Sequence, residues 1–292
     1  MAHSKFSQKI NYLIRSAWKN FTGFGFCCPS CACRSGKIVD RKYLFTALRR
    51  CDNCKLLFRT PTTSEAESEA FYQKAYTEGF TTDMPDDESL DSYLRKGFSG
   101  TEKDYGIYLS ILAVLGVQKG ARMLDFGCSW GYGSWQFKKY GYVVESFEVS
   151  ALRAKFATEK LDLIVHTDPS EINGMFDLFF SAHVLEHVPS VSKILKWAED
   201  HLVPGGLFVA FTPNGTHAFR EKSPKDWSKL WGMVHPNFLD DAYYRTRFMS
   251  QKYLLMSNPY DLNRISNFMS NNSDCFGETS LDGDELLVVV KK

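Results

Sequence analysis

The sequence predicts an α/β fold in which a doubly wound, mostly parallel sheet follows a small cysteine-rich module. Apolar strand-like runs alternate with helix-like segments of about 10–15 residues from residue 101 onward, as in βαβ units. A glycine-rich turn, MLDFGCSWGYGS over residues 123–134, connects one such run to an amphipathic helix. Two C-x-x-C pairs lie close together before residue 60. These patterns divide the chain into a small head and one large domain.

Residues 1–26 are predicted to contain an N-terminal amphipathic helix. Between residues 5 and 21 the apolar side chains recur at helical spacing, while lysine and arginine lie mostly off that stripe. The stripe consists of Phe6, Ile10, Leu13, Ile14, Ala17, Trp18 and Phe21. Such a helix either packs on the body of the protein or lies in the interface of an anionic membrane.

Residues 27–60 are predicted to form a zinc ribbon. Six of the eight cysteines lie between residues 27 and 54, and this clustering indicates metal binding rather than a disulfide framework. Two C-x-x-C knuckles, separated by 19 residues, are formed by Cys28 with Cys31 and by Cys51 with Cys54. Four thiolates in tetrahedral geometry leave no open position, so we expect a structural zinc ion. Cys33 could replace a neighbouring ligand.

Residues 61–100 are predicted to be an acidic helical linker or lid. Ser64 and Glu67 make a capping box, S-x-x-E, which opens a helix through about Tyr76. The remainder, residues 77–100, is acidic and interrupted by glycine and proline. That composition indicates a loop with short helical pieces.

Residues 101–292 are predicted to form the large α/β domain. A helix near 101–116 leads into a strand at 121–126. Further strands are expected at 142–148, 162–166, 175–181, 206–212 and 285–291, and helices near 132–140, 150–159, 189–202 and 238–255. The alternating order predicts a sheet whose strands are mostly parallel and whose two faces are covered by helices.

The glycine-rich turn is expected to bind a nucleotide-like ligand at the point where the strand order of the sheet reverses. Its glycines, Gly127, Gly131 and Gly133, do not have the G-x-G-x-x-G spacing of a dinucleotide site, and Asp125 would repel a pyrophosphate. A ligand with a positive head group fits better. S-adenosylmethionine carries an ammonium and a sulfonium group, and Glu148, 23 residues after Asp125, can accept hydrogen bonds from its ribose.

This segment resembles motif I of class I S-adenosylmethionine-dependent methyltransferases, usually D-x-G-C-G-x-G, with Ser129 in place of the middle glycine. The phrase SAHVLEHV is similar to the H-V-L-E-H stretch of that family, and residues 202–206 and 212–214 match its fifth strand and exit. The resemblance implies a Rossmann-like fold in which Glu148 binds the ribose and Asp168 faces the adenine. The cofactor site that it implies comprises Asp125, Gly127, Cys128, Ser129, Gly131, Gly133, Glu148, Asp168, Ser181 and Ala182.

The head resembles the zinc ribbon of bacterial methyltransferases of sugar and polysaccharide pathways. The string RRCDNCKLLFRTP, followed by FYQKAY, carries this resemblance. A family of rRNA guanine methyltransferases also begins with a zinc ribbon, but a histidine is among its ligands and no such histidine is present here. The resemblance therefore implies a saccharide or small-molecule acceptor.

Three histidines are candidate general bases for transfer to a hydroxyl group: His183, His187 and His235. His183 follows the fourth strand of the domain, where residues of the family face the methyl group. A structural role is an equal alternative for each histidine. The segment 215–250 is expected either to line an acceptor pocket or to pack as a helical insertion, because it is rich in cationic and aromatic side chains, including Phe219, Arg220, Lys222, Lys225, Trp227, Trp231, His235, Tyr243 and Tyr244.

The net charge of +1 conceals an asymmetry, because residues 1–60 carry a net +10 and the rest of the chain carries a net −9. The basic head favours an anionic membrane surface or a phosphorylated acceptor as partner, with nucleic acid less favoured. No apolar run approaches the roughly 20 residues of a membrane span, and residues 1–26 lack the apolar core of a signal peptide. A cytoplasmic location follows, with the surface of the inner membrane as an alternative for the head.

The sequence thus predicts an S-adenosylmethionine-dependent methyltransferase that acts on a small molecule or saccharide in polysaccharide or sugar-nucleotide metabolism. The basic head motivates one alternative, an RNA methyltransferase. Ser129 motivates another, a catalytically degenerate cofactor-binding or scaffold protein. The acceptor and the oligomeric state are not predicted.

Overall fold

The computed structural model describes residues 2–64, 66–67, 83–270, 277–278 and 280–292. The capping box is confirmed, because the Ser64 N–H donates to the Glu67 carboxylate over 2.7 Å and the Glu67 N–H donates to Ser64 Oγ over 3.2 Å. The helix predicted beyond it, through Tyr76, lies mainly outside the described residues. Within them, no helix has both the length and the apolar character that crossing a membrane requires.

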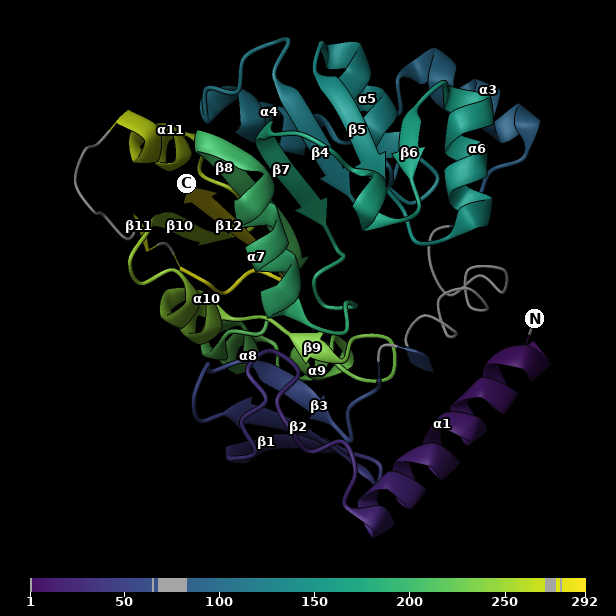
Figure 1. Cartoon of the computed structure of the whole chain (residues 1–292), viewed down its shortest axis with the longest axis vertical. Coiled ribbons are helices and arrows are strands. Elements are labelled where there is room, and N and C mark those ends of the chain that lie inside the picture. The colour runs from purple at the N-terminus through teal and green to yellow at the C-terminus, as the bar shows by residue number, and fades with distance from the viewer. Residues whose placement is uncertain (1, 65, 68–82, 271–276, 279) are drawn as a thin grey trace.

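An eight-stranded mixed sheet forms the centre of the large domain (Figure 1). Its order is β11-β10-β12-β8-β7-β4-β5-β6. The strands are β4 (Arg122–Phe126), β5 (Val143–Phe147), β6 (Ile164–His166), β7 (Phe176–Ala182), β8 (Leu202–Pro213), β10 (Lys252–Ser257), β11 (Gly277–Glu278) and β12 (Glu285–Lys291). The run from β6 to β8 is parallel, whereas β12 pairs antiparallel with both β8 and β10. The predicted mostly parallel sheet is confirmed.

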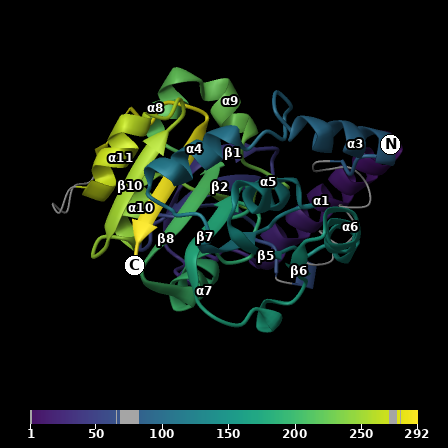
Figure 2. The ribbon, with the colours of Figure 1, turned by 90° about the horizontal axis from the view of Figure 1, so that it is seen from above.

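Helices cover both faces of this sheet (Figure 2). Alternate strand residues point to opposite faces, so Met123 and Phe180 pack on one side and Leu124 and Phe179 on the other. The first side holds α4 (Gly106–Val114), α5 (Tyr132–Tyr140) and α11 (Leu262–Ser270), and the second holds α7 (Val191–His201) and α10 (Asp241–Arg247). Near the glycine-rich turn, α6 (Ala151–Leu161) packs with α3 (Asp87–Lys96) around Trp130.

The prediction of a helix near 238–255 is wrong for the second half of this segment. Helix α10 ends at Arg247, and residues 252–257 form β10, which pairs with β12 over six residues. Leu254, Leu255 and Met256 are good helix formers, but pairing against a buried strand overrides that preference. Helix α11 was not predicted either.

The cysteine-rich module builds a second sheet with a strand from the large domain. Its order is β1-β2-β3-β9, from β1 (Gly36–Lys42), β2 (Thr46–Cys51), β3 (Leu57–Thr60) and β9 (Asn237–Phe238). Beside it lie α8 (His217–Lys222) and α9 (Pro224–Lys229). A shared apolar cluster joins the two parts and contains Leu48, Leu57, Phe219, Trp227, Trp231 and Phe238.

The aromatic residues of 215–250 are therefore packing residues, which corrects their expected place in an open acceptor pocket. Trp227 and Trp231 are each 2% exposed. The indole N–H of Trp231 donates to Asp40 in β1 over 3.0 Å, and that of Trp227 donates to the Gly215 carbonyl over 3.1 Å. Their polar atoms are thus satisfied within the protein.

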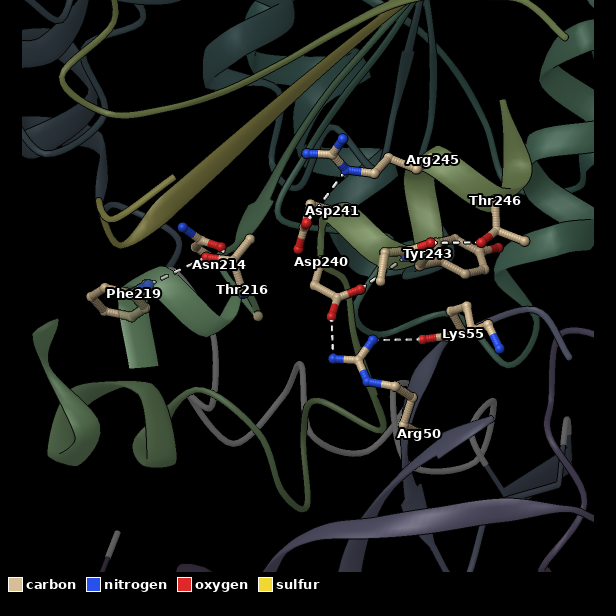
Figure 3. A network of polar contacts seen from close by, with 12 residues as sticks. Arg50, Lys55, Asn214, Thr216, Phe219, Asp240, Asp241, Tyr243, Arg245 and Thr246 are labelled. Carbon is tan, nitrogen blue, oxygen red and sulfur yellow. Dashed lines mark hydrogen bonds and ion pairs between the residues drawn. The ribbon is translucent and has the colours of Figure 1, made fainter. Parts of the chain in front are cut away.

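An ion pair at the start of α10 also joins the module to the domain (Figure 3). Arg50 Nη2 lies 2.6 Å from Asp240 Oδ2, and Arg50 donates a second hydrogen bond to the Lys55 carbonyl. Asp240 caps α10 by accepting the Tyr243 N–H over 3.0 Å. Burial raises the Asp240 pKa to about 6, although the charge of Arg50 lowers it.

The C-terminal end of helix α1 (Ala2–Thr22) lies beside the module, and the helix projects outward from the module on the side of the molecule where α3 and α6 lie (Figures 1 and 2). Lys19 fixes its C-terminal end by an ion pair of 2.6 Å with Glu67 and a hydrogen bond to the Thr62 carbonyl. Part of the apolar stripe of the helix is exposed: Ile14 by 62%, Trp18 by 60% and Phe21 by 93%.

Candidate cofactor site, acceptor site and cysteine cluster

The strand order reverses between β4 and β7, since β5 and β6 follow on one side of β4, and β7 and β8 lie on the other. The loops after the carboxyl ends of β4 and β7 therefore face a common crevice, which is where ligands bind in open α/β sheets. The glycine-rich turn and the SAHVLEHV segment occupy these two loops.

Asp125 lies near the end of β4 and is 3% exposed. Burial raises its pKa to about 7, although a hydrogen bond of 2.6 Å from Ser134 Oγ lowers it. A single hydrogen bond from a neutral donor does not compensate a buried, ionised carboxylate for its lost hydration. The residue is therefore suited to a positively charged ligand group.

Glu148 follows β5 and is 2% exposed. Burial raises its pKa to about 7, opposed by backbone hydrogen bonds from Ser150 at 2.8 Å and Ser129 at 2.9 Å and by the charge of Arg153. The two amides each occupy one oxygen and fix the carboxylate. Each oxygen has a second lone pair with which it can accept a ligand hydroxyl.

Ser129 has a left-handed backbone conformation, with φ of +55°. This conformation explains why glycine is usual at this position, since it costs other residues about 1–2 kcal/mol. The serine hydroxyl accepts a hydrogen bond from Arg153 Nη1, a buried guanidinium on α6. The departure from motif I thus gives the turn a polar link to α6.

Two glycines of the turn are required by close packing. A Cβ at Gly127, where φ is +88°, would lie 2.3 Å from Val184, and a Cβ at Gly133 would lie 2.2 Å from the Tyr105 ring. Cys128 is buried behind the same turn, and burial raises the pKa of its thiol well above the ordinary value. The turn therefore packs against both the β7 loop and the start of α4.

The other predicted cofactor residues lie along the same edge of the sheet. Asp168 follows β6, is exposed, and caps the short 3-10 helix η1 (Pro169–Glu171) by accepting the Ser170 N–H. Ser181 and Ala182 end β7. The Ser181 hydroxyl is buried and has no hydrogen-bond partner among the described residues.

His183 also follows β7 and has a left-handed backbone conformation, with φ of +55°, and its side chain contacts Glu285 of β12. His183 Nε2 lies 2.6 Å from Glu285 Oε1, and Glu285 also accepts hydrogen bonds from the hydroxyls of Tyr108 and Tyr260. The side chain of His183 is 48% exposed, whereas Glu285 is 17% exposed. The imidazole therefore lies at the open side of a buried polar network.

Two carboxylates surround His183. Burial lowers its pKa, but the neighbouring carboxylates of Glu186 and Glu285 outweigh this and raise the pKa to about 10. An imidazolium donates hydrogen bonds but cannot accept a proton. In the free protein, these surroundings favour a positioning role for His183 over the predicted general base.

His187 and His235 come together although they are distant in sequence. Their ring centroids are 4.6 Å apart in an edge-to-face arrangement. His187 Nδ1 lies 2.7 Å from the Val234 carbonyl, and His235 Nδ1 lies 2.6 Å from the Leu230 carbonyl. Both rings are half-buried beside Glu186.

The four predicted metal-binding cysteines converge. The sulfur atoms of Cys28, Cys31, Cys51 and Cys54 all lie within 4.8 Å of one another. The Cys28–Cys54 and Cys31–Cys51 pairs are each 3.5 Å apart. Zinc–sulfur bonds of about 2.3 Å in a tetrahedron place the sulfurs about 3.8 Å apart, so the cluster fits zinc. In the metal-free protein the hydrogen bond to Cys54 and burial raise the pKa of the Cys28 thiol, whereas the backbone N–H groups of Cys31 and Ser30 lower it.

Several site residues could not be inferred from the sequence. Glu285, Tyr108 and Tyr260 meet only because β12 and β10 return beside β8. Arg153 and Ser134 carried no motif signal. Glu186 lay within the SAHVLEHV phrase, and its position between two histidines was the signal that could have identified it.

A model of the methyltransferase domain family matches residues 103–256. A ubiquinone biosynthesis O-methyltransferase of Paramagnetospirillum magneticum is 34% identical over 107 residues, which cover 34% of this chain and 43% of that protein. A cyclopropane-fatty-acyl-phospholipid synthase of Escherichia coli is 31% identical over 105 residues, which cover 34% of this chain and 28% of that protein. The chain thus spans less than half the length of the curated relatives it matches.

Among solved structures, the chain is similar to geranyl diphosphate C-methyltransferase from Streptomyces coelicolor, with a TM-score of 0.49 and 16% identity over 77% of this chain and 97% of that one. An S-adenosylmethionine-dependent methyltransferase from Mesorhizobium loti has a TM-score of 0.43 and 17% identity, covering 63% and 97%. The family match spans more than half of the 292 residues, from α4 through β10. The chain belongs to the methyltransferase domain family.

Proposed function

We propose that the protein transfers a methyl group from S-adenosylmethionine to an oxygen atom of a small-molecule or saccharide acceptor. The observation that carries this proposal is the pair of buried carboxylates, Asp125 and Glu148, at the switch point of the sheet. Asp125 would hold the ammonium group and Glu148 the ribose hydroxyls. Asp168, Ser181 and Ala182 would complete the site along the same edge.

When bound, S-adenosylmethionine supplies a methyl group on a good leaving group, so positioning provides much of the rate. The polar network of His183, Glu285, Tyr108 and Tyr260 lies at the neighbouring strand ends and would position the acceptor. An oxygen acceptor accords with the O-methyltransferase name of one relative. The saccharide class rests on the resemblance of the head to sugar-pathway enzymes.

Calorimetry with S-adenosylhomocysteine tests the cofactor site. Asp125→Ala and Glu148→Ala should each weaken binding by roughly 1.5–3 kcal/mol, the value of a charge-assisted hydrogen bond. Glu145→Ala is a matched control, because this residue lies on the same strand β5 and pairs with Arg122. Absence of S-adenosylhomocysteine binding to the unmodified protein would contradict the proposal.

Methyl transfer to nucleotide sugars and lipid-linked saccharides tests the acceptor class and separates an enzyme from a scaffold. His183→Asn should lower turnover about 100-fold and leave S-adenosylhomocysteine affinity unchanged, as expected for a residue that positions the acceptor. Turnover with RNA instead would favour the RNA methyltransferase.

We further propose that the four-cysteine cluster binds structural zinc. The sulfur positions and the knuckle amides support this assignment, and four protein ligands leave no position for a substrate. Purified protein should contain one thiolate-bound zinc ion per chain, and Cys51→Ser should lose it.

We also propose that α1 docks on an anionic membrane surface. Its exposed stripe of Ile14, Trp18 and Phe21 offers apolar area, and the head around it carries a net +10. The double variant Trp18→Ser, Phe21→Ser should no longer sediment with anionic vesicles, whereas neutral vesicles should bind neither protein. Equal sedimentation of both proteins would contradict this role.

A further inference from the structure

Three side chains outside the cofactor loop converge on one point beside the acceptor network. Glu186 and His187 follow β7, and His235 lies between α9 and β9. One ligand atom from each lies within 4.8 Å of the other two. The fold therefore brings a carboxylate and two imidazoles together across nearly 50 residues of chain.

The hydrogen bonds of the two histidines define their tautomers. A backbone carbonyl only accepts, so His187 Nδ1 donates to Val234 and His235 Nδ1 donates to Leu230. In these neutral tautomers, Nε2 of each ring carries the lone pair. Histidines that bind metals commonly donate the other ring N–H to a carbonyl in this way, which fixes the ring.

Glu186 is the third member and is 1% exposed. Among the described residues neither of its oxygens makes a hydrogen bond. Its Oε1 lies 3.7 Å from His187 Nε2 and 3.6 Å from His183 Nδ1, and both distances are too long for a hydrogen bond. The His183 imidazolium is thus an ion-pair partner that donates no hydrogen bond to Glu186, whereas a metal ion would coordinate the buried carboxylate directly.

We propose that Glu186, His187 and His235 bind a divalent transition-metal ion. Two imidazole nitrogens and one carboxylate oxygen suit zinc and its first-row neighbours. Three protein ligands leave a coordination position open, in contrast to the closed four-cysteine cluster. A metal ion here would orient an acceptor oxygen and acidify its hydroxyl group. That role rests on the proposed methyl transfer, whereas metal binding itself does not.

Cobalt titration of the metal-free, full-length protein tests the site without an activity assay. Thiolate ligands give cobalt intense charge-transfer absorption in the near ultraviolet, and nitrogen and oxygen ligands give only weaker visible bands. Two cobalt ions should bind per chain, one of each kind. Binding of a single ion with the thiolate spectrum would overturn the inference.

Variants assign the second ion to these residues. His235→Ala should bind one cobalt ion with an unchanged thiolate spectrum, and Glu186→Gln, which keeps the shape of the side chain, should bind the second ion at least 10-fold more weakly. His217→Ala is the control, because His217 is 77% exposed on α8, and it should bind two ions. Unchanged binding of the second ion to both site variants would overturn the assignment.

S-adenosylhomocysteine binding to the same samples separates this inference from the proposed function. If the wild-type protein binds S-adenosylhomocysteine and only one cobalt ion, the metal site is contradicted and the proposed function is not. Protein that binds two cobalt ions but no S-adenosylhomocysteine supports the metal site and contradicts the proposed function. The same measurement reports folding, and if His235→Ala fails to bind S-adenosylhomocysteine, Glu186→Gln decides the assignment.

Discussion

Ser129 shows how one side chain can replace the usual glycine of a cofactor turn. Its left-handed backbone is unfavourable, but its hydroxyl receives a hydrogen bond from Arg153 and its N–H donates to Glu148. The two effects oppose each other and have similar magnitudes. The residue that suggested a degenerate site is therefore part of the support of Glu148.

Substitutions at Ser129 should separate these two effects. Ser129→Ala loses the hydrogen bond from a charged donor and keeps the strained backbone, so we expect a loss of about 1.5–3 kcal/mol in the free energy of unfolding. Ser129→Gly loses the same bond but removes the strain, so it should be about 1 kcal/mol more stable than Ser129→Ala. Urea denaturation measures the free energy of unfolding of both variants. An alanine variant as stable as the glycine variant would contradict backbone strain at residue 129.

Asp125 and Glu148 should make cofactor binding depend on pH. Their folded-state pKa values, each about 7, lie above the ordinary values, so the stability they contribute at low pH is lost as the pH rises through 7. The ligand's ammonium group favours ionised Asp125, and its ribose hydroxyls, which donate hydrogen bonds, favour ionised Glu148, so ligand binding reverses this effect. S-adenosylhomocysteine should therefore bind at least about 10-fold more tightly at pH 8 than at pH 6. For Asp125→Asn, calorimetry should show that S-adenosylhomocysteine affinity depends less steeply on pH than in the unmodified protein. An identical pH dependence would exclude Asp125 as a group that titrates on binding.

At the scale of elements, sequence patterns predicted those segments whose local preference agrees with their tertiary contacts. Tyr132–Tyr140 and Glu285–Lys291 have the predicted bounds residue for residue. The strand β10 was missed because its residues are helix formers and its identity depends on pairing with β12. The motif likewise predicted the loop at the switch point of the sheet, whereas the Glu285–Tyr108 contact joins residues 177 positions apart and left no local signal.

The start of α10 offers a test of capping against charge pairing. Asp240→Asn keeps an acceptor for the Tyr243 N–H and removes a carboxylate that is costly to ionise, so stability at pH 7 should change by less than about 1 kcal/mol. Asp240→Ala removes the cap as well and should cost about 1–2 kcal/mol more. Equal stabilities in thermal denaturation would show that the cap contributes nothing.

At the scale of the whole molecule, the head and the large domain are joined by a sheet, an apolar cluster and an ion pair. Strand β9 pairs with β3, and Trp227 and Trp231 pack against Leu48 and Leu57 of the head. Arg50 meets Asp240 at the same interface. The two parts should therefore unfold together.

Loss of the zinc ion proposed for the head should consequently destabilise the entire protein. Structural zinc contributes about 10–16 kcal/mol to isolated zinc fingers, so Cys51→Ser should lower the free energy of unfolding by several kcal/mol. Scanning calorimetry should show one transition at a lower temperature. Cys27→Ser is the control, because Cys27 lies outside the cluster and is half-buried. A separate low-temperature transition with the main one unchanged would show two independent parts.

Strand β9 has a consequence for how such heads can be exchanged between proteins. The sheet of the head is not a continuous stretch of chain, because its fourth strand comes from residues 237–238. A head transplanted as residues 27–60 alone would leave Leu57 and Phe58 without their pairing partner and Phe238 without its cover. The structural unit of the head is therefore discontinuous in sequence. A recombinant enzyme would keep its fold only if residues 215–240 were transferred together with the cysteine-rich segment.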